Sequence, residues 1–378
     1  MRVAVPLERK EGEKRVALVP DIINKLTRLG YEVAIESGAG DNSQGTDAAY
    51  TAAGANVVKG DVIASADIVL SVQPLTPTQM ATLKKGATTI SFLSTVTAID
   101  SIEAAVKAEA TAFSLELVPR ISRAQSMDAL TSQALCAGYR AALVGAELSP
   151  RFFPMLMTAA GTVTPAQVLV LGAGVAGLQA IATARRLGAV VSAYDVRPSS
   201  ADEVKSMGAA FIELELESLE GAGGYAREMT EERAAKQREL LTPYIAKSHV
   251  VITTAAVPGR TAPRLMTQAM IDAMEPGTVI VDLAAETGGN VEGSKPGEIV
   301  VTSGGVRIWG GKDVPSQLPF HASSLYSRNV VNLLTLLTTP AKDGAPVALN
   351  LDFADEIINA SAVTHAGQRR DPSAGGAK

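Results

Sequence analysis

Three glycines, Gly172, Gly174 and Gly177, follow an apolar run with the spacing G-x-G-x-x-G. A glycine at the first position permits a tight turn out of a strand, and one at the second lets a pyrophosphate approach the backbone. The third lets the next helix pack closely on the strand, and the free N–H groups at the start of that helix face the phosphates. This spacing indicates that the segment binds a dinucleotide.

An acidic residue stands where such a site needs one. Asp195 ends the second apolar run, 18 residues after Gly177, where a carboxylate accepts hydrogen bonds from the adenosine ribose and repels a 2′-phosphate. This position favours NAD over NADP, although Arg197 adds a positive charge that weakens the preference. A glycine motif alone also occurs in turns that bind nothing. Here strand, glycines, helix, second strand and acid all occur in one unit, so we predict an NAD site.

The elements that must position this site alternate between strand and helix patterns. The chain opens with a strand pattern at Arg2–Pro6, and the helical pattern Asp21–Leu29 follows, with Asp21 expected as its cap. The mostly apolar pattern Gln133–Leu148 predicts a connecting helix. The stretch Arg151–Ala166 then leads to the glycine unit and is expected to be a plain connection.

This alternation predicts an α/β protein of two doubly wound, Rossmann-like domains with parallel sheets and a cleft between them. The first domain is expected to cover residues 1–132 and to be completed by 315–378. The second, NAD(H)-binding domain is expected to cover residues 133–314. The length of 378 residues is sufficient for two domains with filled cores.

The composition argues against several classes of function. The formal net charge is −5 and no basic cluster is interleaved with aromatic residues, so nucleic-acid binding is not expected. One cysteine and three distant histidines predict neither an internal disulfide nor a metal site. No run approaches the roughly 18 apolar residues of a membrane span, and the amino terminus has no signal-peptide pattern. We therefore expect a cytoplasmic protein that does not itself cross a bilayer.

A second polar segment lies where the first predicted domain ends. It reads Arg-Ile-Ser-Arg-Ala-Gln-Ser-Met-Asp from Arg120 to Asp128. Taken alone, it could be a solvated turn into a helix that Asp128 caps, or a strand-end loop that holds a ligand. The residue types by themselves leave both interpretations open.

The amino-acid sequences of this segment and of four others resemble those of one family. The segments are Leu115–Val118 with Pro119–Asp128, Gly138–Arg140, Met157–Thr162, Gly224–Met229 and Asp282–Asn290. They are similar to the NAD(H)-binding component, domain I of the alpha subunit, of proton-translocating nicotinamide nucleotide transhydrogenase. That component belongs to the alanine dehydrogenase/transhydrogenase superfamily. The resemblance runs from Arg2 to about Val330, and the tail after about residue 340 is unmatched.

The resemblance implies an oxidoreductase and translocase activity, that of a Re/Si-specific NAD(P)⁺ transhydrogenase. Hydride would pass directly between NADH on this chain and NADP⁺ on an NADP(H)-binding partner subunit, coupled to proton translocation by a membrane-domain subunit. It also implies a homodimer that sits peripherally on the cytoplasmic face of the inner membrane through its partners. Such a transfer needs no general acid or base, only two nicotinamide rings held in contact and shielded from water.

The resemblance assigns roles residue by residue. Arg120, Gln125, Asp128 and Tyr225 are the candidates for catalysis: Arg120 would hold the carboxamide and pair with Asp128, Gln125 would reach toward the partner's nucleotide, and Tyr225 would gate the site. The cofactor-binding candidates are Arg120, Ile121, Ser122, Gln125, Ser126, Met127, Asp128, Gly172, Gly174, Val175, Ala176, Gly177, Asp195, Val196, Arg197, Gly224, Tyr225, Gln237 and Ala256. The family member that we compare has Leu where Ala256 stands.

Two other functions fit parts of the sequence. An alanine-dehydrogenase-like enzyme resembles the opening Pro6 to Pro20, but it needs a Lys and a His where Ile68–Gln73 and Phe92–Ser94 have neither. Arg15 is then expected to be held in a salt bridge rather than to bind a substrate. The other alternative is a non-catalytic NAD(H) sensor, for which a mobile loop around Tyr225 would serve equally well.

Overall fold

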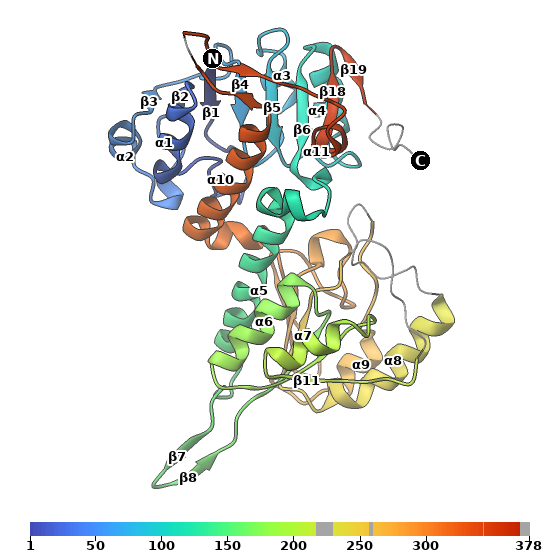
Figure 1. Ribbon diagram of the computed structural model, residues 1–378. Coiled ribbons are helices and arrows are strands. Elements are labelled where there is room, and N and C mark those ends of the chain that lie inside the picture. The colour runs from blue at the N-terminus through green and yellow to red at the C-terminus, as the bar shows by residue number, and fades with distance from the viewer. Residues whose placement is uncertain (217–229, 257–259, 343, 371–378) are drawn as a thin grey trace. The chain divides into compact units, whose positions relative to one another are not determined.

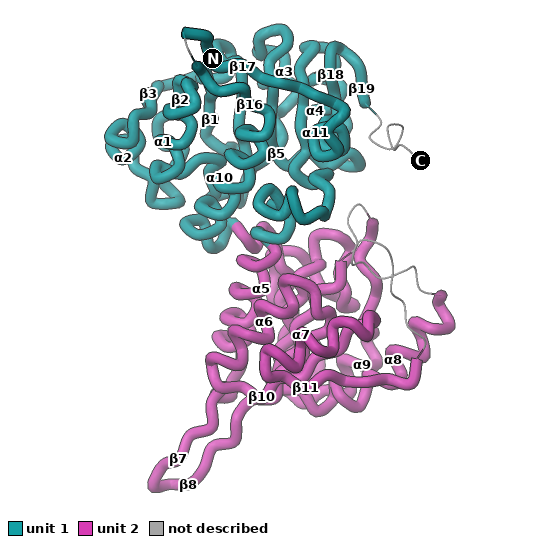
Figure 2. The backbone as a smooth tube through the Cα atoms, in the orientation of Figure 1, with its two compact units in different colours: residues 1–133, 316–378 teal, residues 134–315 magenta. Residues whose placement is uncertain are grey.

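The computed structural model describes residues 1–216, 230–256, 260–342 and 344–370 (Figure 1). They form two compact units, each described here by itself (Figure 2). Unit 1 comprises Met1–Gln133 and Ser316–Lys378, and unit 2 comprises Ala134–Pro315. Unit 2 is therefore an insertion into the sequence of unit 1.

Unit 1 is built on an eight-stranded sheet in the order β3-β2-β1-β4-β5-β6-β18-β19. Strands β1 to β6 are parallel, whereas β18 and β19 are antiparallel additions at one edge. The chain starts at the centre, winds out to β3 and then returns to the other half, which is the doubly wound topology. The strands are β1 Arg2–Val5, β2 Glu32–Glu36, β3 Asn56–Val58, β4 Ile68–Leu70, β5 Thr88–Ser91, β6 Thr111–Ser114, β18 Ala362–His365 and β19 Gln368–Arg369.

Helices cover both faces of this sheet, because successive strand residues point to opposite sides. In β1, Val3 and Val5 pack with residues of α1 and α10, whereas Ala4 packs with residues of α3 and α4. The helices are α1 Pro20–Arg28, α2 Asp47–Ala52, α3 Pro77–Met80, α4 Ile99–Lys107, α10 Pro319–Leu336 and α11 Glu356–Ser361. A short ladder, β16 Thr338–Thr339 with β17 Ala348–Leu349, follows α10.

The first helix differs in its start from the sequence-based expectation. Asp21 does not cap it: Val19 is the N-cap residue, with no side-chain cap hydrogen bond, and Pro20 is the first helical residue. The ring of proline fixes a φ that suits this position, so the helix begins two residues earlier than a capping Asp21 would allow. Asp21 then lies in the first turn, where its negative charge interacts favourably with the positive end of the helix dipole.

The segment after α10 adds two strands to the sheet of unit 1, within the stretch 315–378 that was expected to complete the first domain. Strand β18 pairs antiparallel with β6. The Thr364 hydroxyl donates to the carbonyl of Ala110 at 2.8 Å and accepts from the N–H of Ala112 at 3.1 Å. This strand covers the edge of β6, which would otherwise leave a row of unpaired backbone groups.

Unit 2 contains a seven-stranded sheet in the order β11-β10-β9-β12-β13-β15-β14, parallel except for β14. It repeats the doubly wound order, with β9 and β12 at the centre. The strands are β9 Gln167–Leu171, β10 Val190–Tyr194, β11 Ala210–Phe211, β12 Val250–Thr253, β13 Val279–Asp282, β14 Ile299–Val301 and β15 Arg307–Gly310. The predicted fold class, α/β with mainly parallel sheets, is confirmed.

Two helical layers enclose the sheet of unit 2. On one face Val168 and Val170 pack with residues of α5 and α6, and on the other Leu169 and Leu171 pack with residues of α8 and α9. The helices are α5 Ala129–Leu148, α6 Val175–Arg186, α7 Ser200–Ser206, α8 Glu231–Ala246 and α9 Gln268–Asp272. Helix α5 begins in unit 1 and continues in unit 2, so it is the connecting helix that was predicted from Gln133. Across the described residues, no helix has both the length and the apolar character of a membrane span.

The expected plain connection after α5 forms a β-hairpin. Its strands are β7 Leu156–Thr158 and β8 Gly161–Val163, paired antiparallel. Every residue of both strands is exposed, and the hairpin extends away from the sheet of unit 2 (Figure 1). Gly161, with φ +126° and no atom within 4 Å of an added Cβ, supplies the backbone conformation that this turn needs.

Candidate functional site

The glycine motif has the geometry that a pyrophosphate needs. Gly172 has φ +102°, and an added Cβ on Gly177 would lie 1.9 Å from the carbonyl oxygen of Gly172, so both positions require glycine. Gly174 differs, because nothing lies within 4 Å of its added Cβ. The open side of Gly174 is therefore space from which a ligand can approach the backbone.

Helix α6 begins directly at this loop. Gly174 is its N-cap, and the first i→i−4 hydrogen bond runs from the N–H of Leu178 to the carbonyl of Gly174 at 2.8 Å. The N–H groups of Val175, Ala176 and Gly177 precede that bond and point out of the helix start. These groups and the helix dipole together form an anion-binding surface. The residues present fit the pyrophosphate of a dinucleotide.

Two neighbours of this loop were not predicted from the sequence. An added Cβ on Gly138 of α5 would lie 2.0 Å from the carbonyl oxygen of Ala176, so α5 packs directly against the start of α6. The Thr254 hydroxyl, just after β12, donates to the carbonyl of Gly172 at 3.0 Å. A glycine in the middle of a long helical pattern was the available signal for Gly138, whereas Thr254 carries no local signal.

Asp195 lies at the end of β10, as predicted, and its carboxylate is fully engaged. Its Oδ2 accepts from the N–H of Ala173, within the glycine loop, at 2.7 Å and from Nη2 of Arg197 at 2.9 Å. Its Oδ1 accepts from the backbone N–H of Arg197 at 2.9 Å and from Nε of Arg197 at 2.8 Å. Asp195 is thus joined both to the phosphate loop and to a neighbouring cation.

The remaining predicted residues of unit 2 differ in exposure. Gln237 on α8 is buried, and its Oε1 accepts a hydrogen bond from the Tyr194 hydroxyl at 3.2 Å, next to Asp195. Burial raises the pKa of Tyr194 to about 12, so this phenol stays a donor at neutral pH. Val196 is half-buried and Ala256 is exposed after β12. Gly224 and Tyr225 lie outside the described residues.

The segments that follow β12 and β13 are held together by two buried polar side chains. Asp282 accepts hydrogen bonds from the Thr253 hydroxyl and from three backbone N–H groups, those of Ala284, Asn290 and Val291. The side-chain amide of Asn290 donates to the carbonyls of Ala255 and Pro263, both at 2.8 Å. These contacts fix the loops at the carboxyl ends of two central strands, where doubly wound sheets bind their ligands.

In unit 1 the predicted nicotinamide loop is a 3₁₀ helix, Ser122–Met127, between β6 and α5. Helix α10 holds it in place, because the amides of Asn329 and Asn332 both donate to the carbonyl of Ser126 at 3.0 Å. The side chains divide into two groups: Ala124 and Met127 are buried and Ile121 half-buried in the core of unit 1, whereas Arg120, Ser122, Gln125 and Ser126 are exposed.

Asp128 performs the capping role that the residue types allowed. Its Oδ1 accepts from the N–H of Thr131 at 2.8 Å, and its Oδ2 accepts from the hydroxyl of Thr131 at 2.6 Å. These bonds satisfy the first turn of α5. The contacts of this carboxylate are thus with Thr131, and its expected pairing with Arg120 stays a prediction.

A buried polar cluster in unit 1 is centred on Arg15. Arg15 donates through Nε and Nη2 to the carboxylate of Glu13, at 2.8 and 2.6 Å, and through Nη1 to the Gln133 amide oxygen at 2.9 Å. The salt bridge that was expected for Arg15 is confirmed. Burial alone would raise the pKa of Glu13, but the hydrogen bonds and charge of Arg15 outweigh it and hold that pKa at about 2.

The same cluster includes the loop after β4, at the centre of the sheet. The amide of Gln73 donates to Glu13 at 2.7 Å, and Glu8 accepts a backbone hydrogen bond from Val72. Burial raises the pKa of Glu8 to about 7 despite that hydrogen bond. The guanidinium of Arg15 is thus satisfied by side chains of its own unit instead of being available to a substrate carboxylate.

The doubly wound sheet, the glycine loop at the start of α6 and the acid at the end of β10 define unit 2 as a Rossmann-type dinucleotide-binding domain. Comparison with protein families identifies the family in which this domain occurs. Residues 4–137 match the N-terminal domain and residues 141–372 the C-terminal domain of the alanine dehydrogenase/PNT family. The chain belongs to this family.

Within this family, the chain is more similar to transhydrogenase alpha subunits than to alanine dehydrogenases. The chain is 47% identical over 378 residues to the first polypeptide of the NAD(P) transhydrogenase alpha subunit of Rhodospirillum rubrum, covering 97% of each chain. It is 34% identical over 301 residues to the alanine dehydrogenase of Mycobacterium tuberculosis, covering 78% of this chain and 76% of that one. The resemblance to transhydrogenase alpha subunits that the sequence motifs carry is therefore confirmed.

Solved structures agree with this assignment. The transhydrogenase from Sinorhizobium meliloti superposes with a TM-score of 0.85 at 41% identity, over 99% of this chain and 100% of that one. An L-alanine dehydrogenase superposes with a TM-score of 0.79 at 24% identity, which shows the shared fold alone.

Proposed function

We propose that this chain is the NAD(H)-binding subunit of a proton-translocating transhydrogenase. It would hold NADH so that hydride passes directly to NADP⁺ on a partner subunit, with a membrane-domain subunit coupling the transfer to proton passage. The observation that carries the proposal is the loop Gly172–Gly177, where tight packing at two glycines leaves the third open to a pyrophosphate. We expect the complex to place this chain peripherally on the cytoplasmic membrane face.

The residues available for such a transfer bind and orient instead of moving protons. NADH, when bound, supplies the hydride. Val175, Ala176 and Gly177 would donate N–H groups to the pyrophosphate, and Asp195 would accept from the adenosine ribose. Arg120 and Gln125, both exposed on the loop of unit 1, would orient the nicotinamide carboxamide and the approach of the second nucleotide. The roles of Gly224 and Tyr225 in closing the site belong to the same proposal.

The polar cluster of unit 1 disfavours the dehydrogenase alternative. Oxidative deamination needs a cation for the substrate carboxylate and a base for the departing proton. Arg15, the cation in the opening segment that resembles such an enzyme, is paired with Glu13 and buried. The segments after β4 and β5 contribute Ser71, Gln73 and Phe92 where a Lys and a His would be required.

The experiment that tests the proposal mixes the purified chain with an NADP(H)-binding subunit of a bacterial transhydrogenase. We expect NADH oxidation to match the reduction of thio-NADP⁺ mole for mole, followed by absorbance. A mixture that binds NADH but transfers no hydride would favour the sensor alternative. NAD⁺ reduction by L-alanine, with no transfer to thio-NADP⁺, would instead favour a dehydrogenase.

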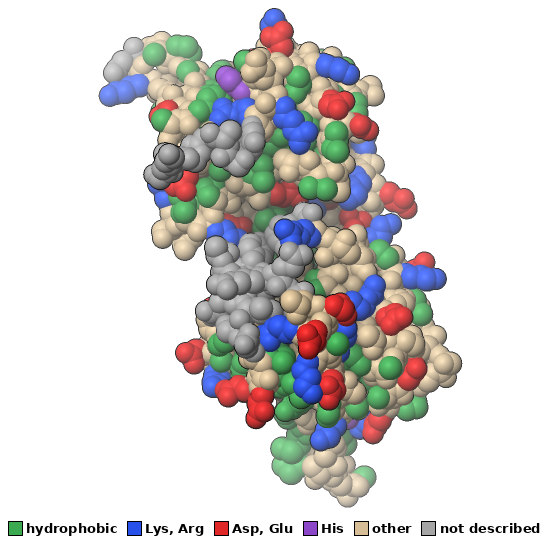
Figure 3. All heavy atoms as spheres, turned by 90° about the vertical axis from the view of Figure 1, so that its right-hand side faces the viewer, with side chains coloured by type: hydrophobic (Ala, Val, Ile, Leu, Met, Phe, Trp, Pro, Cys, Tyr) green, Lys and Arg blue, Asp and Glu red, His purple; other side chains and the backbone are tan. Residues whose placement is uncertain are grey.

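We further propose that the chain is a homodimer whose second copy covers the hairpin β7–β8. No charged residue occurs from Phe152 to Ala166, and the side chains of Met155 and Met157 are 58% and 80% exposed. Figure 3 shows the hairpin end of unit 2 at the bottom, with hydrophobic and uncharged atoms at its tip. A two-stranded hairpin is marginally stable alone in water, and an exposed apolar patch is typical of a protein interface.

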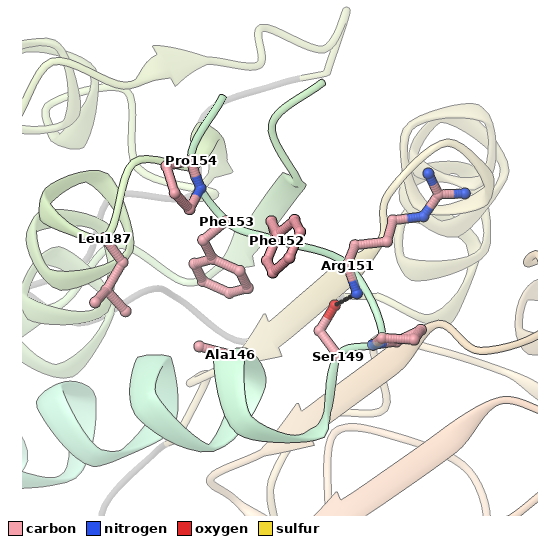
Figure 4. Close-up of a pocket in the computed structure, with 8 residues that line it drawn as sticks. Ala146, Ser149, Arg151, Phe152, Phe153, Pro154 and Leu187 are labelled. Carbon is pink, nitrogen blue, oxygen red and sulfur yellow. Dashed lines mark hydrogen bonds between the residues drawn. The ribbon is translucent and has the colours of Figure 1, made fainter. Parts of the chain in front are cut away.

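A hollow at the base of the hairpin fits the same proposal. It has a volume of about 300 Å³ and is lined by Ala146, Ser149, Pro150, Arg151, Phe152, Phe153, Pro154 and Leu187 (Figure 4). Leu187 is the C-cap of α6, so the hollow lies at the opposite end of this helix from the glycine loop. It is therefore separate from the nucleotide site, and the apolar side chains in its mixed lining would receive a side chain of the second copy.

A further inference from the structure

The carboxylate of Asp195 has as many hydrogen-bond donors as it can accept. An ionised carboxylate offers about four lone-pair sites, two on each oxygen. Four donors fill them: the N–H of Ala173 and Nη2 of Arg197 on Oδ2, and the N–H and Nε of Arg197 on Oδ1. In this arrangement neither oxygen has a free lone pair for a ribose hydroxyl.

The four donors are of two kinds. The N–H groups of Ala173 and Arg197 are backbone groups, fixed by the turn of the glycine loop and by the turn after β10. The other two, Nε and Nη2 of Arg197, belong to one guanidinium on a flexible side chain that is 20% exposed. If this guanidinium moves away, each oxygen of Asp195 regains one lone pair.

The two lone pairs regained match the two adjacent hydroxyls of a ribose. The guanidinium presents its N–H groups as a planar fork to both oxygens of one carboxylate, and the 2′- and 3′-hydroxyls of a ribose also present two neighbouring donors. The guanidinium fork and the diol therefore compete for the same edge of Asp195.

We propose that the Arg197 guanidinium occupies the ribose-binding edge of Asp195 in the free protein and sets nucleotide selectivity when it is displaced. This inference rests on the proposed NAD(H)-binding function. NADH has to displace the guanidinium, so its affinity is lower than the site alone would give. Once displaced, the cation stays within reach of the 2′ position, where it attracts a 2′-phosphate that Asp195 alone would repel.

The test measures the binding of NADH and NADPH to the full chain by nucleotide fluorescence. With Arg197→Ala we expect NADH to bind about three- to tenfold more tightly, because its competitor is removed. NADPH should bind weaker by a similar factor, because the carboxylate is then unneutralised. Arg197→Lys keeps the charge but not the fork, so it should tighten NADH binding and preserve that of NADPH.

Arg186→Ala is the matched control, since Arg186 is exposed on the last turn of α6, far along the helix from the glycine loop. Thermal unfolding checks that each variant is folded. A wild-type chain that binds neither nucleotide would overturn the proposed function and this inference together. A wild-type chain that binds NADH, with an NADH-to-NADPH affinity ratio unchanged by Arg197→Ala and Arg197→Lys, would overturn this inference alone.

Discussion

Replacing Gly174 by alanine should separate nucleotide binding from folding. An added Cβ at this position meets no atom within 4 Å, and the backbone, at φ −78°, is open to any residue. Alanine is a poorer N-cap than glycine, but it also restricts the unfolded chain, and each effect is about 1 kcal/mol or less. These effects oppose one another, so we expect the free energy of unfolding to change by less than about 1 kcal/mol.

Binding should change much more. The methyl group would occupy the side of the loop from which the pyrophosphate has to approach the N–H groups at the start of α6. Losing one charge-assisted hydrogen bond costs about 1.5–3 kcal/mol, which corresponds to roughly a ten- to hundredfold rise in the dissociation constant of NADH. Fluorescence titration with NADH measures this change, and urea denaturation measures the stability.

Two other glycines of unit 2 serve as controls. Gly177→Ala places its methyl 1.9 Å from a backbone oxygen, so it should destabilise the fold by about 1–3 kcal/mol or more as well as weaken binding. Gly304→Ala meets only Thr302 Oγ1, at 3.8 Å, and should leave both quantities unchanged. If Gly174→Ala were folded and bound NADH like the wild type, the pyrophosphate would not lie over this glycine and the site assignment would be wrong.

Four further predictions concern other regions of the chain. Gln125→Asn should leave NADH binding intact but slow hydride transfer to thio-NADP⁺ several-fold, since the exposed amide is shortened by one carbon; a parallel loss of binding would contradict its role toward the partner. Glu13→Gln should lower the free energy of unfolding by about 3–5 kcal/mol in urea, because it leaves Arg15 buried without its counter-charge; a neutral effect would mean that Arg15 finds water or another partner. Because burial raises the pKa of Glu8 from 4.5 to about 7, the folded state holds that proton more tightly, and the free energy of unfolding should fall as pH rises from about 4.5 to about 7. Glu8→Gln should remove this pH dependence, and an unchanged dependence would assign it to another group. Met157→Glu should convert the dimer to a monomer in light scattering while NADH binding persists, whereas a monomeric wild type would refute the dimer.

The α/β order could be predicted from the sequence because buried parallel strands are short apolar runs between helical patterns. The βαβ unit that carries the candidate site in unit 2 could be predicted for the same reason, since Gly172 to Asp195 is contiguous in the sequence. The hydrogen bonds that occupy both carboxylate oxygens of Asp195 could not be predicted. The sequence shows that Arg197 is two residues away, but not that its guanidinium donates to both oxygens. Orientation of a side chain depends on turn geometry that no pattern encodes.

Long-range contacts explain the other differences. The hairpin at Leu156–Val163 has no polar alternation and no surrounding core, so nothing local identified it as a pair of strands. Strand β18 is short and pairs with β6, some 250 residues earlier in the chain. A salt bridge for Arg15 could be predicted from the sequence, but its second partner, Gln133, lies 118 residues away and depends on the tertiary fold.

The division of unit 1 into two stretches of sequence has a consequence for biosynthesis. Residues 134–315 are contiguous, so a chain leaving the ribosome carries everything that unit 2 requires before α10 and β18 have been translated. Unit 1 must until then keep an open sheet edge at β6 and an uncovered apolar face where Tyr326 and Val330 will pack. The nascent amino-terminal segment is therefore the region that most needs a chaperone, and a stop codon shortly after residue 337 should yield an aggregating product rather than a trimmed subunit.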